Sequence, residues 1–311
     1  IVFVWYALSF LMFGEDVAAP RIIAAVLLSF TTLSLFAQVR MLFPRGVAYL
    51  AAIFFALSTG LPYVALHANT EAYLLFPLVT SLLSFTMGIR SRRPGWFLLA
   101  GVLGGLAIMT KQVAFWNLFA LAGVAIWWRW RAAGGGWKAF LPAAYLFAGS
   151  AIAVAVVALP FAYSGALDDF FYANLSYNYK YVGILSSAHH LFILKRTFLF
   201  FLFFSAVAAP LVIGAIVGLL TLLRIRKSRG YYLFMAWALA CALGVATGGR
   251  FYPHYFLEIL PALAVLTAIV IYDRFRNRRF RPVPKLALLA AAVFVGVCAR
   301  SSPCFRCASS S

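Results

Sequence analysis

The sequence predicts an all-α protein, a polytopic bundle of transmembrane helices, on three observations. Of its 311 residues, 65% are hydrophobic and only 11% are charged, whereas soluble domains average about 45–50% apolar and about 25% charged residues. Many stretches of the chain are long enough to cross a bilayer as helices and are almost free of charge. The charges lie in short clusters between these stretches, which is typical of the loops of membrane proteins.

The apolar runs define the predicted elements in chain order. Residues 1–13 are apolar and aromatic but too short to span a bilayer. About ten spans follow, at 18–39, 46–65, 71–89, 96–110, 113–128, 139–161, 196–222, 231–247, 254–272 and 284–299. Because no internal repeat or soluble insertion interrupts the series, residues 1–311 are predicted to form a single transmembrane domain.

Two segments depart from the apolar pattern. Residues 162–195 are the one long hydrophilic connection and are predicted to be an external loop. Residues 300–311 are mostly small or polar and show no helical or strand periodicity, and we predict a disordered tail there.

The basic residues predict the orientation. Alternate loops, from Arg40 to Lys285, carry 18 of the 26 Lys and Arg residues, and the side of the membrane that holds such loops is the cytoplasmic one. The net charge of +19 is therefore explained by topology and by contacts with anionic lipids. Nucleic acid is excluded as a partner, because the charges do not form one continuous basic surface.

The opposite, external side collects the acid–base groups. Six of the seven Asp and Glu residues and all four His residues fall on it. Ionisable side chains at membrane depth are candidates for a functional site. His189 and His190 are adjacent and do not share one helix face, and no pair of His has the i, i+4 spacing, so no metal site is predicted.

Two candidate residues lie at short external turns. Glu71 follows Asn69 and Thr70 at the start of a span. It either stabilises the helix N-terminus, with Asn69 or Thr70 as the cap, or hydrogen-bonds a sugar hydroxyl and takes part in acid–base chemistry. Lys111 sits beside Gln112 in another turn, where it either extends to the membrane interface or binds a phosphate.

The external loop and the last external turn supply further candidates. "LDDFFYANLSYNYKY" places Asp168 and Asp169 before a series of aromatic residues, which form either an interfacial belt or a binding loop. In "GGRFYPHYFLEILP", Arg250 and His254 precede a span. They either anchor the interface or clamp an anion at a helix N-terminus. His254 and Glu258 have the i, i+4 spacing of residues that share one face of an α-helix.

Three of these segments in order, "HANTEAYLLFPL", "GLAIMTKQ" and "GGRFYPHYFLEILPALAVL", resemble the bacterial dolichyl-phosphate-mannose-protein-mannosyltransferase-like glycosyltransferases. These enzymes share the C-type membrane fold of the lipid A aminoarabinose transferase. The resemblance implies the C-type glycosyltransferase architecture, a polyprenyl-phosphate sugar donor, and transfer to a lipid, glycan or protein acceptor on the external face.

The resemblance also implies roles for residues. It makes residues 1–13 a juxtamembrane helix and places the main catalytic aspartate upstream of Ile1, so that the chain lacks the first span and the first external loop and is expected to be inactive alone. The second acidic role falls on Glu71, with Asp168 and Asp169 as the other choices. The expected donor-phosphate contacts are Lys111, Arg250, His254 and Arg21, and the expected substrate contacts are Asn69, Gln112, Tyr252, Tyr255 and Glu258.

Other expectations complete the hypothesis. We expect a multi-pass protein of the bacterial inner membrane whose active site faces the periplasm. A monophosphate leaving group makes a metal optional, so no cofactor is required. The competing functions are a polytopic transporter or lipid-sugar flippase, and a lipid-linked glycan polymerase or ligase. Inverted repeats would favour a transporter, and a diphosphate-linked donor would indicate a polymerase or ligase.

Overall fold

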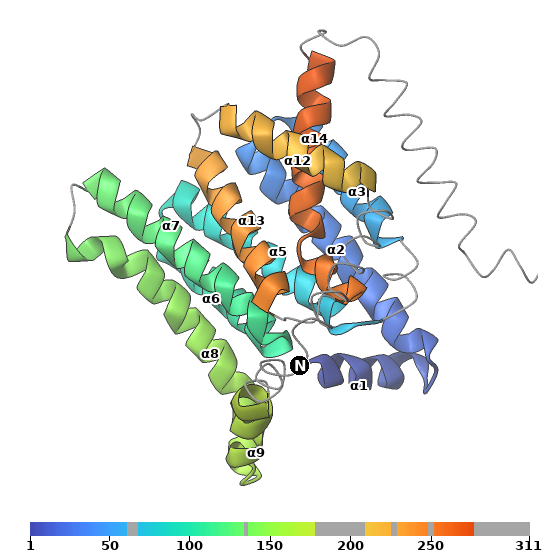
Figure 1. Cartoon of the computed structure of the whole chain (residues 1–311). Coiled ribbons are helices and arrows are strands. Elements are labelled where there is room, and N and C mark those ends of the chain that lie inside the picture. Colours follow the sequence, from blue (N-terminus) through green and yellow to red (C-terminus); the bar gives the residue numbers. More distant parts are fainter. Residues whose placement is uncertain (61–67, 134–135, 178–208, 225–228, 248–251, 277–311) are drawn as a thin grey trace, which may run out of the picture.

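A computed structural model describes residues 1–60, 68–133, 136–177, 209–224, 229–247 and 252–276 (Figure 1). Within these ranges the regular structure is helical and contains no strand. The α-helices are α1 (Val2–Phe13), α2 (Ala18–Leu42), α3 (Arg45–Thr59), α5 (Thr70–Ser91), α6 (Pro94–Thr110), α7 (Phe115–Ala133), α8 (Leu141–Tyr163), α9 (Leu167–Phe171), α12 (Ala209–Arg224), α13 (Arg229–Thr247) and α14 (Leu260–Arg276). Short 3₁₀ segments are η1 (Gln112–Ala114), η2 (Trp137–Phe140) and η4 (Pro253–Glu258), and η3 (Tyr172–Ser176) is a π-helix.

The described helices follow the predicted apolar runs closely. Four helical stretches are long and apolar enough to cross a membrane: Ala18–Leu42, Thr70–Ser91, Trp137–Tyr163 and Gly230–Thr247. Helices α3, α6 and α12 are also apolar, but their apolar helical stretches are shorter than those four. The predicted external loop 162–195 begins as helix, because α9 and η3 occupy most of its described part. The predicted span 284–299 and the predicted tail 300–311 lie outside the described residues.

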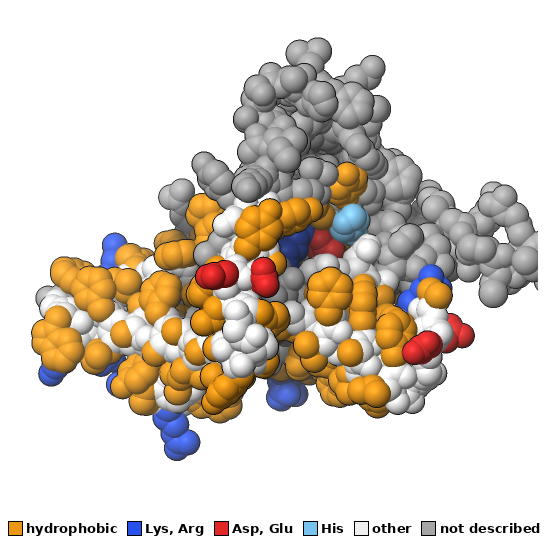
Figure 2. Space-filling model, turned by 90° about the horizontal axis from the view of Figure 1, so that it is seen from below, with side chains coloured by type: hydrophobic (Ala, Val, Ile, Leu, Met, Phe, Trp, Pro, Cys, Tyr) orange, Lys and Arg blue, Asp and Glu red, His pale blue; other side chains and the backbone are white. Residues whose placement is uncertain are grey.

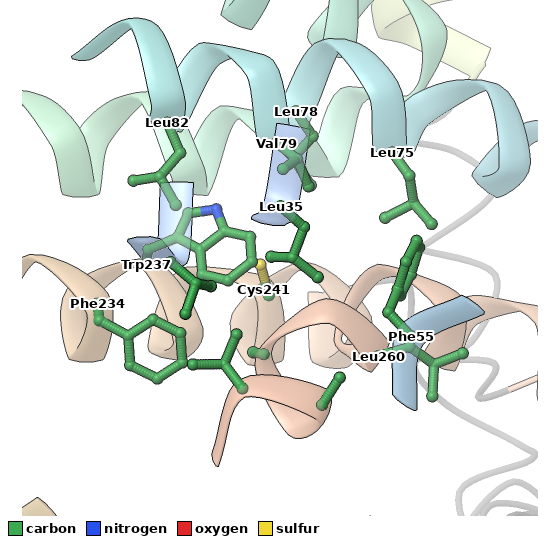
Figure 3. Packing of buried hydrophobic residues seen from close by; sticks show 14 of the residues in the cluster. Leu35, Phe55, Leu75, Leu78, Val79, Leu82, Phe234, Trp237, Cys241 and Leu260 are labelled. Carbon is green, nitrogen blue, oxygen red and sulfur yellow. The ribbon is translucent and has the colours of Figure 1, made fainter. Parts of the chain in front are cut away.

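Helix α5 lies at the centre of the packing. It contacts α2 on one side and α6 on the other, and most of its side chains are buried. In Figure 3 its leucines and Val79 meet side chains from three other helices, namely Leu35 of α2, Phe55 of α3, and Phe234 and Trp237 of α13. The middle of α5 is therefore packed by side chains from several helices.

Small residues let two pairs of helices approach closely. A Cβ atom added at Gly101 of α6 would clash with the carbonyl oxygen of Leu146 on α8, and one added at Gly149 of α8 would clash with that of Leu98 on α6. Gly218 of α12 meets the backbone of α14 at Leu266 in the same way. Close contact between backbones is a common way for helices to associate in membranes, where apolar burial alone does not favour association.

Helix α1 crosses the end of the bundle and does not run along it (Figure 1). Its Trp5 ring stacks on Tyr73 of α5 at 6.4 Å between centroids, and Tyr6 meets the same ring edge-on at 5.7 Å. The Tyr6 hydroxyl donates a hydrogen bond of 2.6 Å to the carbonyl oxygen of Ala68, just ahead of α5. These contacts attach the aromatic helix to the N-terminal end of α5.

The close approach of α6 and α8 predicts the effect of a single methyl group. Replacing Gly149 by Ala should destabilise the protein by about 1–3 kcal/mol, because the added Cβ overlaps backbone that cannot move independently. The matched control is Gly123→Ala on α7, where an added Cβ meets nothing within 4 Å. Thermal unfolding in detergent compares the two, and equal melting temperatures would contradict this account of the packing.

Candidate functional site

Glu71 lies in the first turn of α5, as the sequence predicts. Asn69 is the N-cap residue by position, but its side chain makes no capping hydrogen bond. The Glu71 side chain is only 2% exposed. A carboxylate buried to this extent needs a partner, since an isolated buried charge is strongly unfavourable.

Lys111 provides that partner. It terminates α6 in an extended conformation, and its Nζ atom lies 2.5 Å from Oε1 of Glu71. The same Nζ lies 3.7 Å from the centroid of the Tyr255 ring, in the position of a cation–π contact. Because the Lys111 side chain is 17% exposed and points toward these two groups, it does not simply extend to the membrane interface.

Glu258 is a second carboxyl group beside this pair. The residue is fully buried, and Asn117 of α7 donates a long hydrogen bond of 3.5 Å from Nδ2 to its Oε1. It is close enough to Lys111 and Glu71 to interact with both electrostatically. Its Oε2 atom is buried and accepts no hydrogen bond from any residue that the structure describes.

Gly244 of α13 makes the room that Glu258 occupies. A Cβ atom added to Gly244 would lie 2.9 Å from Cδ and 3.0 Å from Oε2 of Glu258. Cys241, one turn earlier on α13, donates from Sγ to Oδ1 of Asn117 at 3.5 Å. We call Glu71, Lys111, Asn117, Tyr255 and Glu258 the polar cluster.

The predicted alignment of His254 with Glu258 is wrong. The segment Pro253–Glu258 is a 3₁₀-helix, in which residues three apart share a face. Tyr255 therefore aligns with Glu258, whereas His254 is rotated away from it. The His254 ring stacks on Tyr252 with centroids 5.6 Å apart and meets Tyr255 edge-on at 4.9 Å.

Tyr6 of the crossing helix lies close to the polar cluster. Burial, and secondly the nearby Glu71 carboxylate, raise the pKa of the Tyr6 phenol above its usual value. The phenol therefore keeps its proton and remains the donor to Ala68. Tyr6 of α1 therefore lies near the Glu71 carboxylate of the polar cluster.

The other predicted site residues fall into three groups. Gln112 donates from Nε2 to Oδ1 of Asn174 at 3.4 Å, which joins η1 to the start of the external loop. Asp168 and Asp169 lie in the first turn of α9 with exposed side chains, outside the polar cluster. Arg250 lies outside the described residues.

Arg21 borders a separate cavity of about 390 Å³ between α2, α3 and α5. Small and apolar residues line most of it, including Ala24, Leu28 and Ala56. Ala72, the neighbour of Glu71 in sequence, also lines it. The cavity therefore reaches the first turn of α5 at Ala72, and Glu71 is not among its described lining residues.

Sequence reasoning assigned no role in the site to Asn117, Gly244 or Tyr6. Asn117 carried a usable signal, because it is an amide inside the apolar helix "FWNLFALAG". Gly244 and Tyr6 carried none, since a glycine or a tyrosine in a membrane helix has many ordinary explanations.

Figure 2 shows the end of the molecule that carries α1 and α9. Acidic side chains, a basic side chain and a histidine lie near one another there, among hydrophobic side chains. The side chains of this mixed polar group thus lie at the end predicted to be external.

Residues 1–163 match the sequence model of a family described as dolichyl-phosphate-mannose-protein mannosyltransferase. The chain belongs to this family. Together with its long apolar helices, membership makes it a multi-pass membrane protein of the mannosyltransferase family. No curated protein sequence matches the chain.

Solved structures share the fold of this mannosyltransferase-family chain. ArnT from Cupriavidus metallidurans bound to undecaprenyl phosphate is 19% identical with a TM-score of 0.58, and the match covers 96% of this chain and 53% of ArnT. The Archaeoglobus fulgidus oligosaccharyltransferase in complex with Zn and sulfate is 18% identical with a TM-score of 0.55, covering 94% of this chain and 42% of that one. The chain therefore spans about half the length of the structures it resembles.

The described residues contain no group of three or more His, Cys, Asp and Glu side chains placed to hold a metal ion. The polar cluster itself offers two carboxylates, Glu71 and Glu258, with a lysine beside them. In the described part of the chain the site is thus an ion pair and a second carboxyl group.

The ion pair predicts non-additive effects of mutation. Glu71→Gln and Lys111→Met should each destabilise the protein by about 3 kcal/mol. The first variant leaves the Lys111 ammonium without its carboxylate, and the second leaves the buried Glu71 carboxylate without its cation. The double variant should lose at least about 1 kcal/mol less than the sum of the two, since the second change removes nothing further. Unfolding in detergent measures the cycle, and strict additivity would mean that the pair is not coupled.

Proposed function

We propose that the chain is part of a membrane glycosyltransferase that moves a sugar from a polyprenyl-phosphate donor to a lipid, glycan or protein acceptor. The observation that carries the proposal is Lys111, a cation held by Glu71 and Tyr255 at one end of the bundle in a chain of this family. The ligands named with the similar structures, undecaprenyl phosphate and dolichol-phosphate, are consistent with such a donor.

In this proposal Lys111 binds the donor phosphate. As the sugar leaves, charge develops on the phosphate oxygens, and a preorganised cation stabilises that charge. Arg250 and His254 are proposed as further phosphate contacts, and the packing of His254 against Tyr252 and Tyr255 keeps its ring beside the site. Tyr252, Asn69 and Gln112 are proposed to contact the sugar or the acceptor.

The cavity beside Ala72 is a suitable place for the hydrocarbon tail of the donor. Its lining by small and apolar residues of α2 and α3 fits a polyprenyl chain. Arg21 lies on its border, where a guanidinium can bind a phosphate oxygen. A donor with its tail in this cavity would have its phosphate near the end of α5 that bears Glu71.

Acceptor activation requires a base, and the sugar carbon takes on oxocarbenium character during transfer. We assign the base to a carboxylate outside the polar cluster. Glu71 is then the second acid, which orients Lys111 through their ion pair. Asp168 and Asp169, exposed at the start of the external loop, are proposed to contact the acceptor.

The site is proposed to face the periplasm from the bacterial inner membrane, and the transferred sugar is a hexose or a pentose. The positive-inside distribution of Lys and Arg supports this orientation. The proposed mechanism uses no metal, because Lys111 and the neighbouring cations meet the charge of a monophosphate.

The test uses the full-length protein that contains this chain, in proteoliposomes with a polyprenyl-phosphate sugar. Lys111→Met should lower kcat/KM by about 10²–10³, the usual loss for one preorganised donor. Release of polyprenyl phosphate measures turnover. The control is Lys138→Met, which removes an exposed basic residue in the loop between α7 and α8 and should leave turnover unchanged.

Three results would contradict the proposal. Wild-type turnover in a folded Lys111→Met protein would show that Lys111 does not bind the donor phosphate. Turnover only with a diphosphate-linked donor would indicate a polymerase or ligase. Movement of the lipid-linked sugar across the bilayer without any cleavage would indicate a flippase.

A further inference from the structure

A second cavity lies where the ends of four helices meet. It has a volume of about 540 Å³ and is lined by the C-terminal ends of α5 and α7 and the N-terminal ends of α6 and α8. These are the ends that carry Arg90, Arg92, Arg129 and Arg131, so they belong to the predicted cytoplasmic side. The cavity is therefore at the opposite end of α5 and α6 from Glu71 and Lys111.

The charge of this cavity is one-sided. Arg92 and Arg129 line it, and no Asp or Glu is among the described residues that line it. The rest of the lining includes Phe97, Trp128, Pro142 and Tyr145, which are aromatic or apolar. A ligand that matches both the arginines and the apolar lining has a negatively charged group attached to an apolar group.

Arg92 adopts a backbone conformation that is unusual for arginine. It ends α5 in the left-handed region, at φ 58° and ψ 18°, a position that glycine usually takes at the end of a helix. A side chain other than Gly or Asn is unfavourable there, and backbone strain of this kind is frequent at ligand sites. The chain thus presents a guanidinium at a position where a glycine would be less strained.

Trp128 adds an unsatisfied hydrogen-bond donor. The ring lines the cavity, and its Nε1 atom is buried and donates to no acceptor among the described residues. Buried N–H groups are nearly always paired with a protein atom, water or a ligand. Because the atom itself is buried, a ligand oxygen would reach it only if the indole ring turned, so the ring contributes apolar lining to the cavity.

We propose that this cavity binds the phosphate headgroup of an anionic phospholipid of the cytoplasmic leaflet. Arg92 and Arg129 make charge-assisted hydrogen bonds to the phosphate, and the acyl chains lie along Phe97 and Pro142. Basic pockets between helix ends on this side of a membrane are known to hold such headgroups. The site is separate from the proposed donor site and does not depend on the glycosyltransferase proposal.

The test measures lipid binding to the purified protein by native mass spectrometry, with phosphatidylglycerol and phosphatidylcholine as probes. The wild-type protein should prefer phosphatidylglycerol. The preference should fall about fivefold for each arginine removed, in Arg92→Gly and in Arg92→Gly/Arg129→Gln. Glycine suits the left-handed backbone at position 92, so the first variant should keep its fold.

The matched control is Arg131→Gln, because Arg131 lies at the same end of α7 and stacks on Trp127, 5.2 Å from its ring centroid, without lining the cavity. It should keep the preference of the wild type. An equal loss in Arg131→Gln would show diffuse charge attraction and overturn the proposal. Displacement of the lipid by millimolar inorganic phosphate would also overturn it.

Discussion

The ion pair between Glu71 and Lys111 is the interaction on which the site depends. A carboxylate that is 2% exposed is stabilised by a neighbouring cation, and no Lys or Arg lies within ten residues of Glu71 in the chain. Lys111, 40 residues away, meets this need where α6 ends beside the start of α5. The pair therefore ties the N-terminal end of α5 to the C-terminal end of α6 and fixes the direction in which the lysine points.

The rest of the fold is arranged around that requirement. Close backbone contact between α6 and α8, made possible by Gly101 and Gly149, holds α6 firmly enough to keep Lys111 in reach of α5. The room next to Gly244 lets a second carboxyl group, Glu258, approach the pair from η4. A cluster with two carboxyl groups and one lysine is short of positive charge, so an anionic phosphate can bind beside it only with further cations, for which Arg250 and His254 are the proposed sources.

Sequence reasoning predicted the helices well, because a bilayer requires long apolar runs and the runs are visible. It also selected Glu71 and Lys111, since ionisable residues are conspicuous at the ends of apolar helices. It could not pair them, because the pairing depends on which helices are neighbours. The alignment of His254 with Glu258 failed because a 3₁₀-helix replaces the assumed α-helix, and Gly244 was missed because its role is the space it leaves.

In the proposed mechanism the Nζ atom of Lys111 contacts the phosphate of a polyprenyl-phosphate donor. This contact either replaces its contacts with Glu71 and Tyr255 or is made in addition to them. The most direct measurement is a structure of the full-length protein with bound undecaprenyl phosphate. We expect a phosphate oxygen about 3 Å from Nζ of Lys111, with the tail in the cavity beside Ala72. A phosphate bound elsewhere, with Lys111 still held by Glu71 and Tyr255 alone, would contradict it.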